Sequence, residues 1–131
     1  MTIAVVDAAM VVDLICGLPA ADPFRGHLAA VDAVAAPAHL DAEVLSALGR
    51  LKRAGQLTHG AQRVRALGTL GAKRWPLPPL LSAAWALTDR IAVRDALYVA
   101  LAVSLDATLL TTDERLRRGA SGIVNIAEPD E

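Results

Sequence analysis

The sequence has 131 residues, a net charge of −1 at pH 7 and a hydrophobic content of 54%. Its length fits one compact domain over residues 1–131, and its apolar content excludes an intrinsically disordered chain. No apolar run approaches the roughly 18–20 residues that span a bilayer. The start of the chain lacks a basic region, and Cys16 is the only cysteine. These features exclude a disulfide framework and a thiolate zinc site, and they indicate a cytoplasmic protein with no membrane partner.

The first third of the chain alternates short apolar runs with helical patterns. Residues 3–6, "IAVV", predict a strand that is buried on both faces, and a helix is expected over 8–18. Asp22 and Pro23 suit the first positions of a second helix, which should reach about residue 31. A second strand is expected at 33–37. This alternation is typical of βαβ units.

The rest of the chain continues the same alternation. A long helix is expected within 39–54, with Gly55 as its stop, because apolar residues recur there at helical spacing. Three prolines in 72–81 predict an extended connector with a short strand at its start. The other expected elements are helices at 58–70, 80–89 and 91–106, a strand at 107–111, a short helix ending at Gly119 and a last strand at 123–126. The sequence therefore predicts an α/β domain with helices on both faces of a parallel sheet.

Two aspartates come directly after expected strands. Asp7 follows the first strand, and Asp113 lies two positions after Thr111, the end of a later one. Because parallel strands end at the same edge of a sheet, both acids are expected at that edge, where ligands bind. A local role as helix N-cap stays open for Asp113. Asp7 is harder to explain locally, since a carboxylate at the end of a buried strand is costly without compensation.

Two further acids lie on expected helices. Glu43 is adjacent to Val44 of the buried stripe, so we expect it to be partly buried. Asp95 opens an apolar helix, where the helix N-terminus favours a carboxylate. An exposed position for Glu43 and an N-cap role for Asp95 are the alternatives. If all four acids share one cleft they repel one another, and Mg²⁺ or Mn²⁺ would relieve that repulsion.

An acidic metal site of this kind supports hydrolysis of a phosphodiester. The metal polarises the phosphate and lowers the pKa of a bound water. Arginines are frequent in the middle of the chain, and a basic surface beside an acidic pocket suits such a substrate. The histidines show no metal-ligand spacing and are expected at surface or supporting positions; they are His27, His39 and His59.

Four segments resemble the PIN-domain ribonucleases, specifically the VapC toxins of bacterial toxin–antitoxin pairs. They are "VVDAAMVVDL" with Asp7, "APAHLDAEVLSAL" with Glu43, "RDALYVALA" with Asp95 and "LLTTDERL" with Asp113. The acids follow in the family's order, at intervals of 36, 52 and 18 residues. The resemblance implies a three-layer α/β/α sandwich with a mainly parallel sheet of four to five short strands. It also implies metal-dependent endonucleolytic cleavage of RNA.

The resemblance assigns roles and partners as well. Asp7, Glu43, Asp95 and Asp113 would bind Mg²⁺ or Mn²⁺ and activate water, and Thr111 would form hydrogen bonds within the site. A homodimer is implied, together with a cognate VapB-type antitoxin whose C-terminal segment blocks the acidic cleft.

The chain departs from the family pattern at three positions. Ala9 stands where many members have Ser or Thr, and Arg94 stands where an aromatic residue is frequent. Some members have another Asp or Asn shortly after the fourth acid, and here Glu114 either replaces it or is a solvated residue. These departures leave open whether the site binds one metal ion or two.

Two other functions compete with a nuclease. A phosphoaspartate-type phosphatase needs an Asp-x-Asp motif after the first strand, because the second carboxylate protonates the leaving group. Here the motif is Asp7-Ala8-Ala9. The other alternative is an inactive PIN-fold module that only binds RNA or protein, for which Ala9 leaves room. Four mutually repelling carboxylates argue against a pure binder.

Overall fold

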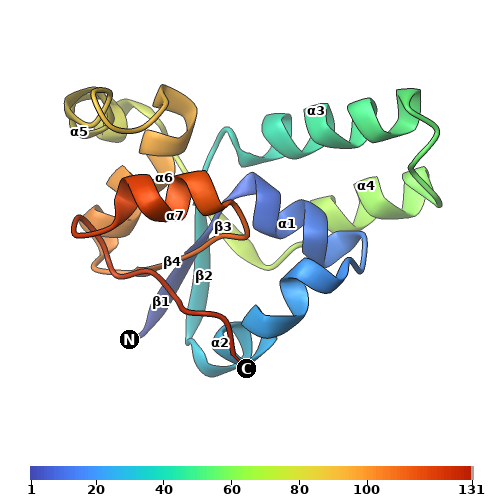
Figure 1. Ribbon diagram of the computed structural model, residues 1–131, viewed down its shortest axis with the longest axis horizontal. Coiled ribbons are helices and arrows are strands. Elements are labelled where there is room, and N and C mark those ends of the chain that lie inside the picture. The colour runs from blue at the N-terminus through green and yellow to red at the C-terminus, as the bar shows by residue number, and fades with distance from the viewer. Residues whose placement is uncertain (131) are drawn as a thin grey trace.

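Four short strands form one parallel sheet at the centre of the protein (Figure 1). The computed structural model describes residues 1–130. The strands stand in the order β3-β2-β1-β4, and every neighbouring pair is parallel. Their bounds are β1 (Ile3–Val6), β2 (Ala33–Pro37), β3 (Ala72–Trp75) and β4 (Thr108–Leu110). Parallel neighbours need crossover connections, and helices supply them here.

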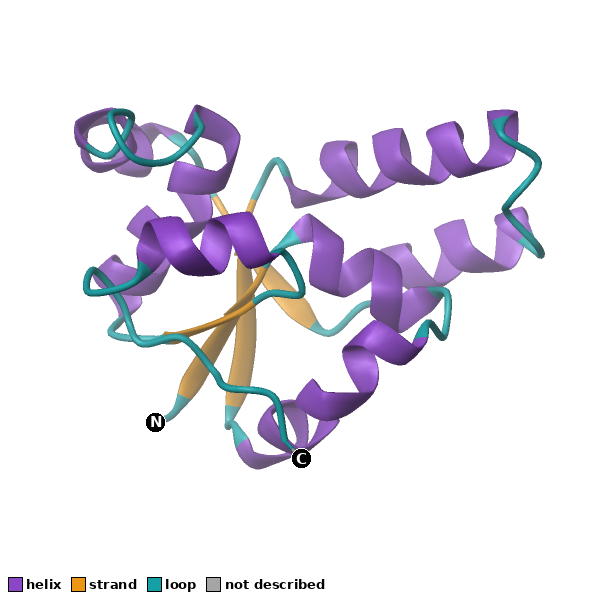
Figure 2. Cartoon of the chain, in the orientation of Figure 1, coloured by secondary structure: helices purple, strands orange, loops and turns teal. Residues whose placement is uncertain are grey.

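Helices cover both faces of this sheet (Figures 1 and 2). Their bounds are α1 (Ala8–Ile15), α2 (Arg25–Ala30), α3 (Leu40–Arg53), α4 (Gly60–Gly68), α5 (Leu81–Ala86), α6 (Val93–Leu105) and α7 (Glu114–Ala120). In Figure 1, α1, α3 and α4 lie to the right of the strands, and α5, α6 and α7 lie to the left. The predicted three-layer α/β/α sandwich is therefore confirmed. Within residues 1–130, no helix has the length and apolarity that crossing a membrane requires.

The strand order creates a switch point between β1 and β4. The chain first builds the sheet from β1 through β2 to β3, and then returns to place β4 on the free side of β1. The connections on the two sides of β1 therefore cover opposite faces of the sheet, and a crevice opens at the carboxyl ends of β1 and β4. Val6 pairs with Leu110 in this register. Asp7 and Thr111 consequently leave neighbouring strands side by side.

The hydrophobic core explains the continuous apolar runs in the sequence. Ala4, Val5 and Val6 of β1 are almost fully buried because helices cover both sides of the strand. In α6, every residue from Ala96 to Ala102 is buried. This helix packs against three strands on one side and α5 on another, so it is apolar around most of its circumference.

The second predicted helix and the proline-rich connector are corrected by the structure. The expected helix at 22–31 is a 3₁₀ helix, η1 (Pro19–Phe24), followed by α2. Pro19 suits the first position of η1, so helical structure starts earlier, and Asp22 pairs with Arg25 at 3.1 Å instead of capping. The connector also contains a 3₁₀ helix, η2 (Pro78–Leu80). The fixed φ of proline suits a helical turn as well as an extended chain.

The predicted last strand at 123–126 is also wrong. Within residues 1–130, this segment makes one isolated parallel bridge, between Ile126 and Leu109. Because β4 has only three residues, it offers little edge to pair with. The chain then leaves the sheet, and the Asp130 N–H donates to the Pro23 carbonyl at 2.8 Å.

Candidate active site

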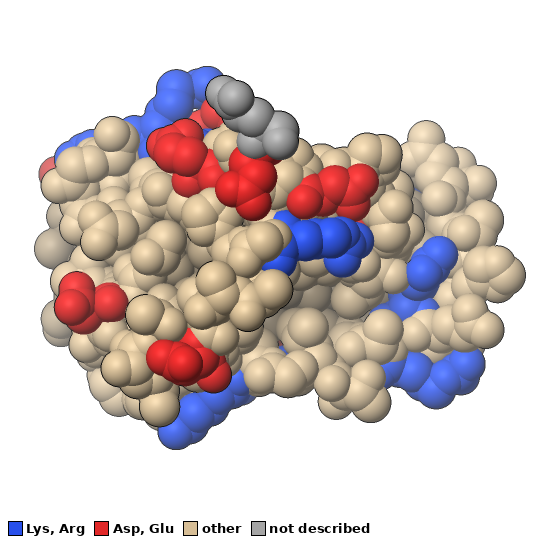
Figure 3. Space-filling model, turned by 90° about the horizontal axis from the view of Figure 1, so that it is seen from below, with Lys and Arg blue, Asp and Glu red and all other residues tan. Residues whose placement is uncertain are grey.

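A cleft of about 310 Å³ lies beyond the carboxyl ends of the strands, where α1, α3, α6 and α7 begin. The structure brings all four acids of the predicted site into its lining, together with Asp13; the four are Asp7, Glu43, Asp95 and Asp113. Helix N-termini carry partial positive charge, so this position reduces the cost of gathering carboxylates. At the opposite end of the sheet, seen from below in Figure 3, charged side chains of both signs lie in small separate groups.

Asp7 joins the end of β1 to the start of α1. Its Oδ1 accepts a hydrogen bond from the Met10 N–H at 2.9 Å, which caps α1, and its Oδ2 accepts one from the Thr111 hydroxyl. The residue is only 3% exposed. Burial raises the pKa of its carboxyl to about 7; the hydrogen bonds oppose this shift, and the negative charges of Asp113 and Asp95 add to it.

Thr111 links Asp7 to Asp113. The Thr111 hydroxyl oxygen accepts a hydrogen bond from the Asp113 N–H at 2.9 Å, while its hydrogen is donated to Asp7. Asp113 Oδ1 accepts from the N–H groups of Arg115 and Leu116 at 2.9 and 3.3 Å, so Asp113 is the N-cap of α7. Asp113 therefore has both roles, as a helix cap and as an acid of the cleft.

Asp95 does not cap its helix, which corrects one of the two sequence interpretations. The helix α6 begins at Val93, and its N-cap is Ala92, so Asp95 is the third helical residue. Among residues 1–130, its side chain has no hydrogen-bond or ion-pair partner. Burial raises the pKa of this carboxyl, and the charges of Asp113 and Glu43 raise it further. A partly buried carboxylate without a partner is costly, and capping does not account for it.

Glu43 extends from the first turns of α3, and its side chain is 16% exposed, as its place beside the buried stripe predicts. Tyr98 donates its hydroxyl to Glu43 Oε1 at 2.6 Å. The Nε2 of His39 lies 3.3 Å from the same oxygen, and a guanidinium nitrogen of Arg94 lies 3.7 Å from Oε2. Burial and the bond to Glu43 raise the pKa of Tyr98.

The sequence interpretation overlooked Tyr98 and left His39 without a specific role. A signal was available for both. Tyr98 follows Asp95 by three positions on one helix, and His39 precedes Glu43 by four, so each should share a face with an acid of the site.

Two of the three positions that depart from the family pattern line the same cleft. Ala9 lines it, as do two arginines, Arg50 and Arg94. Glu114 lies outside the cleft lining, and its side chain is 74% exposed and 3.6 Å from Arg117. This favours the interpretation of Glu114 as a solvated residue of the first turn of α7.

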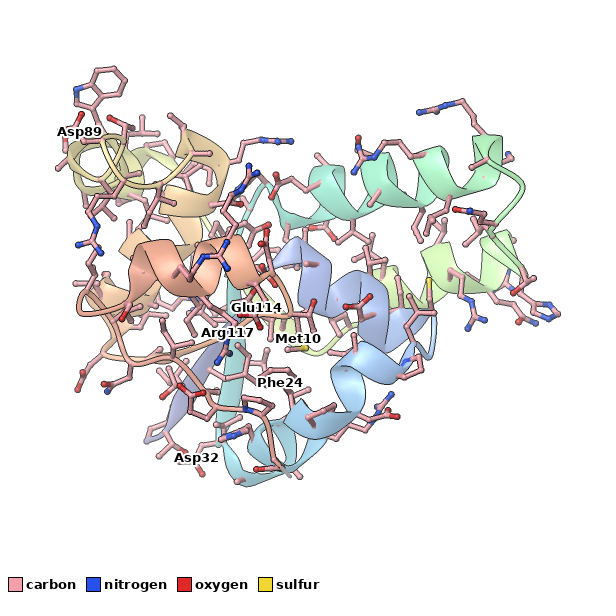
Figure 4. The ribbon with its side chains drawn as sticks, in the orientation of Figure 1. Met10, Phe24, Asp32, Asp89, Glu114 and Arg117 are labelled. Atoms are coloured by element: carbon pink, nitrogen blue, oxygen red, sulfur yellow. The ribbon has the colours of Figure 1, made fainter. Side chains whose placement is uncertain are left out.

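Arg117 points away from the cleft. Its guanidinium reaches from α7 towards Phe24, 5.8 Å from the ring centroid (Figure 4). It donates to the Ala127 carbonyl at 2.8 Å and to the Glu128 carboxylate at 3.0 Å. This arginine therefore attaches the C-terminal segment to the body of the domain.

The donors in the cleft fit a hard divalent cation. Carboxylate oxygens are the ligands that Mg²⁺ and Mn²⁺ prefer. Burial, and after it the repulsion between the acids, raises the pKa values of Asp7 and Asp95, and such an ion would relieve that repulsion. Among residues 1–130, no three acidic, histidine or cysteine side chains already stand close enough to surround an ion. Mg²⁺ commonly uses one or two carboxylates and completes its shell with water and substrate phosphate, so such a preformed group is not required.

Comparison with known proteins agrees with this geometry. The PIN domain family profile matches residues 4–121. Ribonuclease VapC3 of Mycobacterium tuberculosis (strain CDC 1551 / Oshkosh) is 46% identical over 117 residues, which cover 87% of this chain and 85% of VapC3. Ribonuclease VapC1 of the same strain is 41% identical over 115 residues, covering 86% of each chain. A solved toxin–antitoxin complex from Klebsiella pneumoniae matches the fold with a TM-score of 0.66 at 19% identity, covering 98% of both chains. The chain belongs to the PIN-domain family and, within it, to the VapC ribonucleases.

Proposed function

We propose that this protein is the toxin of a toxin–antitoxin pair, an endoribonuclease that cleaves RNA phosphodiester bonds with Mg²⁺ or Mn²⁺. The observation that carries the proposal is the convergence of Asp7, Glu43, Asp95 and Asp113 in one cleft at the switch point of the sheet. The sequence identity of 46% between this chain and a protein named Ribonuclease VapC3 supports the same activity. The proposed unit is a single domain over residues 1–131.

One or two of the four carboxylates would hold the cation directly, and the others would face its bound water. When bound, it would polarise the phosphate and lower the pKa of a water molecule. Asp7 and Asp113 are fixed by their capping bonds and by Thr111, so their oxygens are oriented before substrate arrives. This preorganisation reduces the rearrangement that the reaction requires.

Arg50 and Arg94 supply positive charge at the rim of the acidic cleft. A phosphodiester backbone carries one negative charge per nucleotide, and arginine pairs well with phosphate oxygens. Arg94 is well placed for this role because its side chain is 77% exposed and lies 3.7 Å from Glu43. We propose that these two arginines hold the RNA strand over the carboxylates.

The proposed partners follow from the family. The solved Klebsiella pneumoniae structure is named a toxin–antitoxin complex, and we propose that a VapB-type antitoxin inhibits this protein by covering its acidic cleft. We further propose a homodimer that acts in the cytoplasm. Coexpression with a VapB-type antitoxin, sought in a reading frame that adjoins the gene, tests this partner: the antitoxin should restore growth and copurify with this chain.

The decisive experiment compares RNA cleavage by the wild type and Asp7→Asn. Each protein is incubated with RNA and Mg²⁺, Mn²⁺ or EDTA. The wild type should cleave with either metal and stop in EDTA, and Asp7→Asn should be inactive throughout. Equal residual cleavage by both proteins would remove the nuclease assignment.

An inactive binding module is the second candidate. Ala9 favours it, because this residue lines the cleft where many members of the family carry a hydroxyl. RNA retention without cleavage in either metal would support that candidate over the nuclease.

A further inference from the structure

Tyr98 connects α6 to Glu43 of α3 from inside the protein. The residue is 1% exposed, yet its hydroxyl lies 2.6 Å from Glu43 Oε1. A buried tyrosine usually has a hydrogen-bond partner for its hydroxyl, and here that partner is the carboxylate of Glu43. Tyr98 follows Asp95 by three residues, so a single helix face presents both an acid of the cleft and the donor that holds another acid.

His39 lies beside the same oxygen. Its Nε2 lies 3.0 Å from the Arg94 carbonyl oxygen and 3.3 Å from Glu43 Oε1. A carbonyl can only accept, so Nε2 carries the hydrogen and donates it to Arg94. The ring also packs against Tyr98, with centroids 4.7 Å apart. Tyr98 is therefore the hydrogen-bond donor to Oε1, and His39 packs beside that bond.

The other carboxylate oxygen of Glu43 is in a different position. Its neighbour is Arg94 at 3.7 Å, and that side chain is 77% exposed and lies at the rim of the cleft. Oε1 is thus hydrogen-bonded to Tyr98 in the protein interior, whereas Oε2 faces Arg94 at the rim of the cleft. A free glutamate side chain has several rotatable bonds, and the hydrogen bond from Tyr98 selects one orientation among them.

We propose that Tyr98 is a positioning residue, which holds Glu43 by Oε1 and thereby presents Oε2 to a divalent cation or to water bound by that cation. This inference rests on the proposed function, because it requires a cation in the cleft. Hydrogen bonds behind a liganding carboxylate orient it and are commonly worth 10–100-fold in metal affinity.

The first test measures Mn²⁺ binding directly, by calorimetry on the full chain without RNA. Tyr98→Phe keeps the ring and removes the hydroxyl, so we expect Mn²⁺ affinity to fall by about 10- to 100-fold. Thr69→Val is the matched control, because it removes a hydroxyl that bonds the Arg65 carbonyl at 3.1 Å, outside the cleft lining. The control should bind Mn²⁺ as the wild type does.

A double-mutant cycle separates positioning from general loosening of the fold. If Tyr98 acts through Glu43, then adding Tyr98→Phe to Glu43→Gln should cause little further loss of Mn²⁺ affinity. An equal loss in both backgrounds would overturn the inference, and so would unchanged affinity of Tyr98→Phe. Absence of both Mn²⁺ binding and RNA cleavage in the wild type would instead overturn the proposed function.

A second measurement uses the native tyrosine and does not depend on Tyr98→Phe folding. Tyr98 is the only tyrosine in the sequence, so labelling tyrosine with ¹³C at Cζ gives one assigned resonance. Titration with Mg²⁺ should shift this resonance in the wild type and leave it unchanged in Glu43→Gln. A resonance that ignores Mg²⁺ in a wild type that binds the ion would overturn the inference.

Discussion

Replacing Asp7 with asparagine should abolish cleavage and also stabilise the metal-free protein above about pH 7. Burial raises the pKa of the Asp7 carboxyl from 3.8 to about 7 in the folded state. The unfolded chain therefore releases this proton near pH 3.8, and the folded protein keeps it until about pH 7. Between these values the folded state binds one proton more than the unfolded state, so the free energy of unfolding falls as pH rises.

The size of the effect follows from the same shift. One proton corresponds to about 1.4 kcal/mol per pH unit, so over roughly three units the wild type should lose at most about 4 kcal/mol. Asparagine does not ionise, and it still accepts the capping bond from Met10. Its second side-chain atom is an NH₂ group, so the Thr111 hydroxyl loses its acceptor, and losing that hydrogen bond costs about 1 kcal/mol. We therefore expect Asp7→Asn to be about 2–3 kcal/mol more stable than the wild type in alkaline chelator.

Denaturant unfolding in EDTA, from about pH 4 to about pH 8, measures this difference. The gap between wild type and Asp7→Asn should widen with pH. Asp13→Asn is the matched control, because it removes the same charge from a partly buried position near the other end of α1. Parallel stability curves for the wild type and Asp7→Asn across this pH range would refute the reasoning.

Substitutions at three further positions separate structural from catalytic roles. Asp95→Asn should abolish cleavage while stability in chelator stays equal or rises, because repulsion in the cleft is relieved; a melt showing a large loss with intact activity would contradict this. Asp113→Ser keeps an N-cap oxygen and Asp113→Ala does not, so only the alanine variant should lose about 1 kcal/mol, while cleavage assays should show both inactive. Arg117→Leu removes the bonds to Ala127 and Glu128, and should cost about 1–3 kcal/mol in denaturant unfolding while the variant still cleaves RNA; unchanged stability would show that these bonds contribute nothing.

The sequence predicted most of the fold because its local and global signals agree. The strand at 3–6 and the helix within 39–54 both appear close to their expected bounds. The predictions that failed lie where local chemistry is ambiguous. Proline permits both a 3₁₀ turn and an extended chain, which is why η2 was missed. The run at 123–126 looks like a strand, but β4 gives it only one bridging residue.

The site was predictable to the level of its acids and no further. Sequence order places Asp7 and Asp113 at strand ends, but their approach depends on β4 pairing with β1, which is a property of the assembled sheet. The hydrogen bond from Tyr98 to Glu43 joins residues 55 positions apart, so it depends on how α6 packs beside α3. Such a contact has no local signature, although the helical spacing of Tyr98 from Asp95 indicates its face.

Helix capping and metal binding are compatible uses of one aspartate. The caps at Asp7 and Asp113 each use Oδ1, and these bonds fix the orientation of the whole carboxylate at a helix N-terminus. A strand–Asp–helix pattern is therefore no argument against function. Asp95 is the stronger evidence for a cation, because no cap bond holds it, and because burial and then the charges of Asp113 and Glu43 raise its pKa. Such a carboxylate costs stability in the metal-free protein, and a bound cation is the partner that would compensate for it.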